Sequence, residues 1–490
     1  NYYQLGPIYN NLGKIYMETG DNEQALDAFD KALYIYTTTF NNNHPDISLI
    51  LMNIGYCHFL AKDYDKAIKY YNQSLINNNK TTIVTIKAYR NLGKVYEKKL
   101  NKTEAEKYYD NAIKLSQYLL GNNHYETAKS LLDKGEFLNS IDDKKEEGIK
   151  LLFQALNIYK NIFGEKHPDI SYCYTVIGDY YFNKQNYYEA LKYYQKAIIS
   201  ISLGFNNQDI YTNPTIENSI LDINLIAPLQ QKALTLMKIG FNDKSIKELE
   251  ASIKTYLIII KLIDKIKVNY YETTTLNLLE KANRIFDEAI KACLYTYTLS
   301  NNIMYKNLTF ELAEKSKSAI LISAIQNVKA KYLGNIPKSI EIYENNLKNE
   351  IALYNKLIYD EEISNHPSLQ KISLWRSKLI SLNEEKTALE NFLNKNYPSY
   401  YSLKYNYNVI KINEIQNKLN KDQIIIEYTY TDSTIFIFLV SKNNFIIKEV
   451  NIDSTFNTQV MNLLKSISCN NFSKINKNEF YKYIYSAFTL

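Results

Sequence analysis

Small and large apolar residues recur at fixed spacing through the first two hundred positions of the chain. In the segment Asn11–Ala32, Gly13 and Ala25 are small, whereas Tyr16 and Phe29 are large and aromatic. The spacing of three or four within each half predicts two amphipathic helices. The small residues allow close approach of the helices, and the aromatic rings fill the layer beside them. Such a pair cannot bury its apolar face alone, so we expect copies that stack.

The copies are present, because the same order of residues returns five more times. Aligned on the small residue of the first helix, the six copies are marked by Gly13, Gly55, Gly93, Gly135, Gly178 and Ala233. This order and spacing are those of the tetratricopeptide repeat, in which helix pairs stack into a right-handed solenoid. The fourth copy is degenerate and contains one inserted residue. We therefore predict a mostly α protein whose residues 1–200 hold repeats one to five.

A histidine-containing loop precedes three of these repeats and supplies His44, His124 and His167. In two of the loops Pro and Asp follow the histidine, which is typical of a helix start. We expect each histidine to close its loop onto the preceding helix. Because the three positions lie one repeat or more apart, they cannot ligate one ion, and we predict no metal site. This longer repeat with its HPD loop resembles the kinesin-light-chain type of tetratricopeptide repeat.

The remaining pattern divides the chain further. Turn signals interrupt the repeat period after the fifth repeat. Further along, apolar residues recur every three or four positions in two seams, Ser339–Tyr359 and Ile372–Leu393, and Lys386 interrupts the second seam. Internal packing of these seams is favoured over a coiled-coil dimer. We predict a loop insertion at 201–228, further tetratricopeptide-like helical pairs and a cap at 229–335, a long helical hairpin at 336–396, and an incomplete α+β segment at 397–490.

The α+β segment begins where the helical period gives way to β-branched and aromatic runs. These runs are Ile424–Tyr430, Thr434–Val440 and Phe445–Val450, and short polar turns separate them. Runs of this kind predict a three-stranded meander. Three strands need a helix or further strands on one face, so we expect the chain to stop within a domain.

Composition excludes several classes of function. The formal charge of +6 includes no run of five basic residues, so we predict no direct binding of nucleic acid. Cys57, Cys173, Cys293 and Cys469 lie far apart without CxxC spacing, so we expect buried or incidental thiols, no disulfide framework, no catalytic residue and no cofactor. The most apolar run, Tyr256–Ile263, is too short to span a membrane. We expect a cytoplasmic protein; the start at Asn1 leaves open export after removal of an N-terminal signal.

Partner binding is expected on the concave side of the solenoid, on the first helix of each repeat. The repeat register selects ten residues for this face, which are Asn10, Lys14, Met52, Tyr56, Phe59, Arg90, Lys94, Glu136, Asp179 and Phe182. Their cationic and aromatic character near the N-terminal end suits a protein or peptide partner with carboxylates, or a helix laid in the solenoid groove. The alternative is that they face solvent or the capping segment of the chain itself.

Three blocks of the sequence are distinctive, namely LTFELAEKSKSAILISAI at Leu308–Ile325, NYPSYYSLKY at Asn396–Tyr405, and IIIEYTYTDSTIFIFLVSKNNFIIKEV at Ile424–Val450. With them the chain resembles bacterial CHAT proteins, in which tetratricopeptide repeats precede a caspase-like domain. The resemblance implies a helical sensor that regulates, and recruits substrates to, a cysteine peptidase of the caspase and separase type. The catalytic His-Gly and Cys motifs of that family lie further downstream, and no residue of this chain matches them.

Two functions therefore remain open. In the first, the solenoid is the regulatory part of a caspase-like peptidase, and its groove holds an activator, a substrate or the peptidase domain itself. In the second, the chain is a non-catalytic tetratricopeptide scaffold whose α+β segment is a terminal cap. Motifs with His-Gly and Cys downstream of Leu490 would distinguish the two.

Overall fold

The computed structural model describes residues 2–18, 21–40, 44–77, 82–202, 204–215, 223–269, 272–328, 336–362, 368–405, 410–431, 434–452 and 458. Contacts between Cα atoms divide the chain into two compact units. One unit comprises Asn1–Glu280 and Asn335–Pro398, and the other comprises Lys281–Gly334 and Ser399–Leu490.

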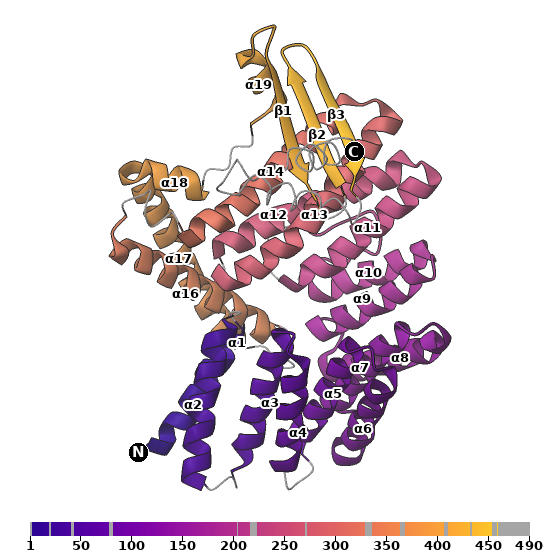
Figure 1. The fold of residues 1–490 in the computed structure, drawn as a ribbon, viewed down its shortest axis with the longest axis vertical. Helices are drawn as coiled ribbons and strands as arrows, with labels where there is room; N and C mark the ends of the chain where they lie inside the picture. Colours follow the sequence, from indigo (N-terminus) through magenta and orange to yellow (C-terminus); the bar gives the residue numbers. More distant parts are fainter. Residues whose placement is uncertain are drawn as a thin grey trace, which may run out of the picture. The chain divides into compact units, whose positions relative to one another are not determined.

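Helices of the first unit pair in sequence order and form the stacked repeats (Figure 1). The pairs are α1 (Leu5–Glu18) with α2 (Asn22–Phe40), α3 (Pro45–Leu60) with α4 (Tyr64–Asn77), α5 (Ile83–Lys98) with α6 (Lys102–Leu120), α7 (Tyr125–Asn139) with α8 (Lys145–Phe163), α9 (Pro168–Asn183) with α10 (Tyr187–Ile201), and α11 (Ile226–Asp243) with α12 (Ile246–Asn269). Short 3₁₀ turns, η1 (Tyr2–Gln4), η2 (Asp142–Lys144) and η3 (Ile223–Leu225), lie beside them.

Each marker glycine faces a large side chain of the second helix of its own pair. A Cβ atom added to Gly55 would lie 2.8 Å from the ring of Tyr71, and one added to Gly178 would lie 2.5 Å from the ring of Tyr194. These distances are below van der Waals contact, so the glycines allow the two helices to approach. The sequence prediction of close helix approach at the small residues is confirmed. In the sixth pair, whose marker position is Ala233, it is Gly240 whose added Cβ atom would lie 2.6 Å from the side chain of buried Leu249.

Four of the first helices are followed by a residue in the left-handed conformation. Lys62, Leu100, Gln185 and Lys244 follow α3, α5, α9 and α11 and have φ of 62°, 60°, 59° and 52°. The residue after each then donates its backbone N–H to a carbonyl five residues earlier, for example Asn101 N to Tyr96 O at 2.9 Å. This bond satisfies a carbonyl at the helix end, and the chain reverses into the second helix.

First helices also contact each other from repeat to repeat. Helix α3 contacts α5, α5 contacts α7, and α9 contacts α11, whereas successive second helices make no comparable contacts among the described residues. Elements on the inner side of a curved stack are closer together than those on the outer side. The first helices therefore line the inner side of the repeat stack.

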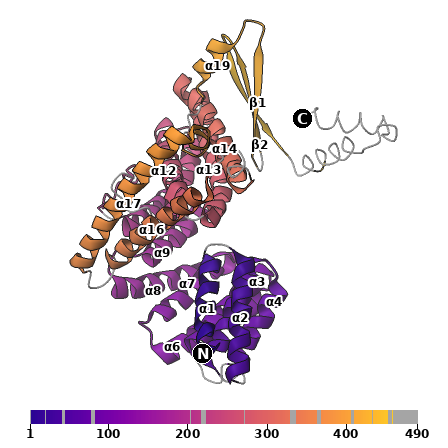
Figure 2. The ribbon, with the colours of Figure 1, turned by 90° about the vertical axis from the view of Figure 1, so that its left-hand side faces the viewer.

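The first unit also contains a long helical hairpin made of α16 (Lys338–Glu362) and α17 (Leu369–Asn396), which run side by side (Figure 2). Leu347 and Ile351 of α16 and Leu382 and Leu393 of α17 are buried in it. The predicted seams thus pack against each other. The pKa of Lys386, the residue that interrupts the second seam, is lowered by burial, and the neighbouring Glu390 opposes this shift.

The second unit places three strands against helix α14 (Ile303–Val328). Strands β1 (Ile424–Tyr430), β2 (Thr434–Ser441) and β3 (Phe445–Asn451) form an antiparallel sheet in the order β1-β2-β3. Every second residue of β2 is buried. The rings of Phe310 on α14 and Phe438 on β2 have centroids 5.4 Å apart. Helices α13 (Glu272–Ser300), α18 (Pro398–Tyr405) and α19 (Ile412–Lys418) complete the described elements.

The predicted fold class is confirmed: the chain is a mostly helical tetratricopeptide-repeat solenoid with a small C-terminal sheet. The meander lies at the predicted residues to within one position at each strand end. The division into compact units adds that α14 groups with the sheet. The boundaries expected at 201–228, 229–335, 336–396 and 397–490 stay predictions.

Candidate interaction face

We call the inner surface formed by α1, α3, α5, α7 and α9 the first-helix face. The ten residues selected from the sequence all lie on these helices, but their exposure differs. Asn10, Met52 and Arg90 are buried, and Glu136 is exposed; the others are intermediate, namely Lys14, Tyr56, Phe59, Lys94, Asp179 and Phe182. Their contacts decide which of them are free to bind a partner.

Residues at the N-terminal end of this face contact each other. Asn53 donates its side-chain amide to the Oδ1 atom of Asn10 at 3.3 Å, across α1 and α3. Met52 packs in a core cluster with Tyr71 and Leu92, and the Tyr56 and Phe59 rings stack with centroids 6.1 Å apart. Asn10 and Met52 therefore serve the packing between repeats.

Arg90 joins repeats three and four through two carboxylates of α7. Its Nη1 atom lies 2.5 Å from Glu126 Oε2, and its Nε atom lies 2.9 Å from Asp133 Oδ2. Lys94 Nζ lies 3.2 Å from the other oxygen of Asp133, and Lys87 Nζ lies 3.3 Å from Glu126 Oε1. Burial alone would raise the pKa of Asp133, but Lys94 and Arg90 outweigh it and the net pKa is lowered. Two of the predicted cations of this face, Arg90 and Lys94, thus neutralise carboxylates of the neighbouring repeat.

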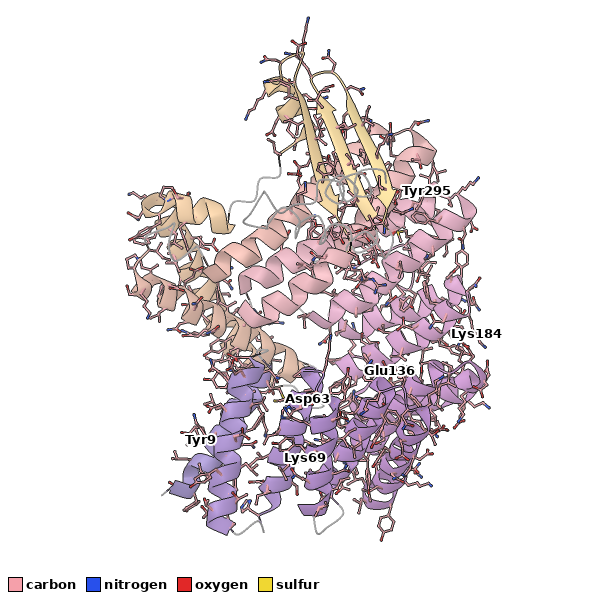
Figure 3. The ribbon with its side chains drawn as sticks, in the orientation of Figure 1. Tyr9, Asp63, Lys69, Glu136, Lys184 and Tyr295 are labelled. Atoms are coloured by element: carbon pink, nitrogen blue, oxygen red, sulfur yellow. The ribbon has the colours of Figure 1, made fainter. Side chains whose placement is uncertain are left out.

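Glu136 and Asp179, by contrast, have no cationic partner within ion-pair distance among the described residues. The hydroxyl of Tyr172 donates to Glu136 Oε2 at 2.8 Å, and that of Tyr194 donates to Asp179 Oδ1 at 2.7 Å. Desolvation raises the pKa of Glu136 and raises that of Asp179 to about 6; each shift is partly offset by the tyrosine hydrogen bond. Repulsion from Glu136 also raises the pKa of Asp179, so the two carboxylates lie close enough to interact. Figure 3 labels Glu136 on α7.

Tyr172 contacts both Glu136, through its hydroxyl, and a lysine, through its ring. Tyr172 is 42% exposed, and Lys129 Nζ lies 5.4 Å from the centroid of its ring. Neither residue was selected from the sequence. The sequence contained a signal for this position. Lys129 and Tyr172 each stand six positions before the marker glycine of their repeat, and Glu136 and Asp179 directly follow these glycines. Residues seven positions apart lie on the same face of a helix. Of the other selected residues, Lys14 on α1 is partly buried, and Phe182 packs against Tyr187 with ring centroids 5.5 Å apart.

The three loop histidines cap the helices that follow them. The Nδ1 atoms of His44, His124 and His167 accept the backbone N–H two residues ahead, at 3.2, 3.1 and 3.2 Å. The His167 ring stacks on Phe163 of the preceding helix, with ring centroids 3.6 Å apart. The prediction that the histidine closes the loop onto the preceding helix is confirmed here. No group of three residues able to hold a metal ion occurs in the part of the chain that the structure describes.

The thiols lie in the helical core. Cys57, Cys173 and Cys293 are free and buried, and burial raises the pKa of the Cys57 thiol to about 11. His58 next to it stacks on Tyr70 instead, with ring centroids 5.3 Å apart. Cys469 lies outside the described residues. Among the helices that the structure describes, none has the length and apolar character needed to cross a membrane.

Family models identify the repeats directly. Models described as tetratricopeptide repeat match residues 4–75, 85–126 and 171–198. These segments cover the first and second pairs, the third pair with the start of α7, and the fifth pair. The chain is therefore a tetratricopeptide-repeat scaffold over these residues.

Individual proteins resemble parts of the chain. The clustered mitochondria protein homolog of Debaryomyces hansenii is 28% identical over 173 residues, which are 34% of this chain and only 11% of that protein. Among solved structures, BtubC (BKLC) from P. vanneervenii is 20% identical, covering 39% of this chain and 79% of its own, with a TM-score of 0.35. A kinesin light chain with TPR-like repeats from Podosopora anserina is 14% identical, covering 40% and 94%, with a TM-score of 0.34.

Proposed function

We propose that the chain binds a protein or peptide partner on its first-helix face. The observation that carries this proposal is the contrast along that face. Side chains between repeats three and four pair with each other, whereas Glu136, Tyr172 and Asp179 in repeats four and five keep polar atoms and ring surface available. An inner surface of helical repeats that presents such groups suits an extended polypeptide.

The finer proposal is that this scaffold is the regulatory and substrate-recruiting part of a caspase-like cysteine peptidase. Two of the sequence blocks that resemble CHAT proteins supply neighbouring elements, since Leu308–Ile325 lies in α14 and Ile424–Val450 forms the sheet. Lys317 of the first block pairs with Glu427 of the second, and Phe310 packs on Phe438. The proposal places the catalytic His and Cys outside these 490 residues, and the peptidase domain itself is one candidate occupant of the first-helix face.

A non-catalytic scaffold is the second candidate. The burial of Cys57, Cys173 and Cys293 makes these thiols unreactive and is compatible with both candidates, since the first candidate also uses no thiol of these residues. Comparing the intact mass of the natural protein with its reading frame separates the two candidates. A product with His-Gly and Cys motifs after Leu490 favours the peptidase; a natural end at Leu490 removes it.

Site-specific photo-crosslinking tests the binding face. A benzophenone amino acid would replace Tyr172 on the first-helix face or Tyr118 on α6, which is 83% exposed. We expect a discrete partner band from position 172 and none from position 118, because only the former lies on the proposed surface. Equal crosslinking from both positions, or a band from position 118 alone, would overturn the proposal.

A further inference from the structure

We infer that the first-helix face of repeats four and five binds an extended peptide that carries lysine or arginine side chains, which pair with Glu136 and Asp179. This inference rests on the proposed function and names the chemistry of the partner. It reverses the expectation drawn from the sequence, in which cationic residues of the face would take a peptide with carboxylates.

The first step concerns the cations of the face. Arg90 is buried between Glu126 and Asp133, and Lys94 shares Asp133. A peptide carboxylate would have to displace one of these internal partners, and it would then leave a buried carboxylate of α7 unpaired. Removing one member of such a pair is costly, so the arrangement disfavours an acidic partner.

The second step concerns the carboxylates. Glu136 and Asp179 follow the marker glycine directly in repeats four and five, so they occupy equivalent places on adjacent first helices. Each accepts a hydrogen bond from one tyrosine hydroxyl. A carboxylate has about four acceptor positions, so oxygen capacity remains on both for a donor from outside. Desolvation raises both pKa values, and repulsion from Glu136 adds to the shift at Asp179, so a bound cation would stabilise both charged carboxylates.

The third step concerns Tyr172, whose ring stands next to Glu136. Lys129 Nζ lies over this ring at 5.4 Å, so the position already accommodates positive charge beside an aromatic surface. A lysine or arginine stem can pack on the exposed part of the ring while its charged end reaches a carboxylate. Extended peptides place alternate side chains on one side, so one peptide can present cations to both Glu136 and Asp179.

Fluorescence anisotropy on the full chain tests the inference. The probes are fluorescein-labelled peptides that alternate serine with lysine, glutamate or glutamine. The variant is Glu136→Gln with Asp179→Asn, whose amide oxygens can still accept the tyrosine hydrogen bonds. The matched control is Glu23→Gln with Asp143→Asn, which removes the same charge from exposed residues of α2 and η2. Thermal unfolding of both double variants verifies that they fold.

We expect the lysine peptide to bind the unaltered chain. The Glu136/Asp179 double variant should bind this peptide at least about tenfold more weakly. The Glu23/Asp143 control should match the unaltered chain. Equal loss in both double variants would overturn the inference, because binding would then follow net charge alone. Preferred binding of the glutamate or glutamine peptide would overturn it as well.

Failure of this inference is distinguishable from failure of the proposed function. If no peptide binds, or the wrong peptide binds, while position 172 still crosslinks to a partner, the charge preference is overturned and the binding face stands. If the lysine peptide binds the unaltered chain and the double variant equally while position 172 crosslinks to nothing, both proposals are overturned.

Discussion

Glycine, which has no side chain, allows the two helices within a repeat to pack closely. Gly55 faces the ring of Tyr71, which is fully buried. We predict that Gly55→Ala lowers the free energy of unfolding by about 1–3 kcal/mol, because the added methyl group overpacks this contact. Chemical denaturation monitored by circular dichroism measures the change.

The control for this substitution replaces the ring that Gly55 faces by a smaller side chain. In a Tyr71→Leu background, Gly55→Ala should cost little or should stabilise, because alanine favours a helix by about 1 kcal/mol over glycine. A double-mutant cycle measures this coupling. Additive effects would show that the ring is not the cause.

Lys232 is fully buried on α11 without a carboxylate partner at ion-pair distance among the described residues. Its Nζ atom donates to Gln195 Oε1 at 2.7 Å, Thr212 O at 2.5 Å and Asn213 Oδ1 at 2.9 Å. Burial lowers its pKa to about 7, and Asp209 opposes this shift. The amine thus fastens residues of the expected loop insertion to α10 and α11.

Its depressed pKa predicts a pH dependence of stability. Between about pH 7 and pH 10 the unfolded chain binds more protons at this lysine than the folded chain does, so stability should rise with pH. The expected contribution is roughly 3–5 kcal/mol across this window. Urea denaturation at several pH values measures it, with Lys232→Met as the comparison. The rise should be smaller in the variant; identical slopes would contradict the assignment.

Histidine caps act at the scale of single helices. In His167 the Nδ1 atom accepts from Asp169 N, while the ring stacks on Phe163. We predict that His167→Ala lowers the unfolding free energy by about 1–2 kcal/mol, because both the cap and the stacking are lost. His167→Asn should recover part of this loss, since asparagine can also cap. Equal losses in thermal unfolding of the two variants would show that the cap contributes nothing.

Arg90 acts between elements, because it joins α5 to α7. We predict that Arg90→Met costs about 3 kcal/mol, since Glu126 and Asp133 would lose their shared buried partner. Lys31→Met removes an exposed partner of Asp27 and should cost less than about 1 kcal/mol. Denaturant titration compares the two. Equal costs would contradict a special role for burial of the Arg90 pairs.

The elements themselves were largely predictable from the sequence, because helix pairs and strands follow local periodicity. The glycine positions located the pairs, and alternation in Thr434–Val440 located β2. The pairing of Arg90 with Asp133 was not predictable, since it depends on how adjacent repeats are offset in space. The grouping of α14 with the sheet is a contact between residues more than a hundred positions apart, which periodicity does not encode.

At the scale of the whole molecule, the two compact units interleave in sequence. The chain leaves the first unit near Glu280, returns to it at Asn335, and leaves it again at Pro398. Within the repeats each helix pair contacts mainly its neighbours. Stability of such an array is approximately a sum of local terms, so a local defect should spread little.

This organisation yields a prediction about where a defect is felt. Phe438 is fully buried in the sheet and packs on Phe310, so Phe438→Ala should cost about 3–5 kcal/mol within the second unit. Hydrogen exchange measured by mass spectrometry should show faster exchange in β1–β3 and α14, with α3–α6 unchanged. Gly55→Ala should produce the opposite pattern. If either substitution accelerates exchange equally in both sets of elements, the units unfold together, because a defect in one would then destabilise the other.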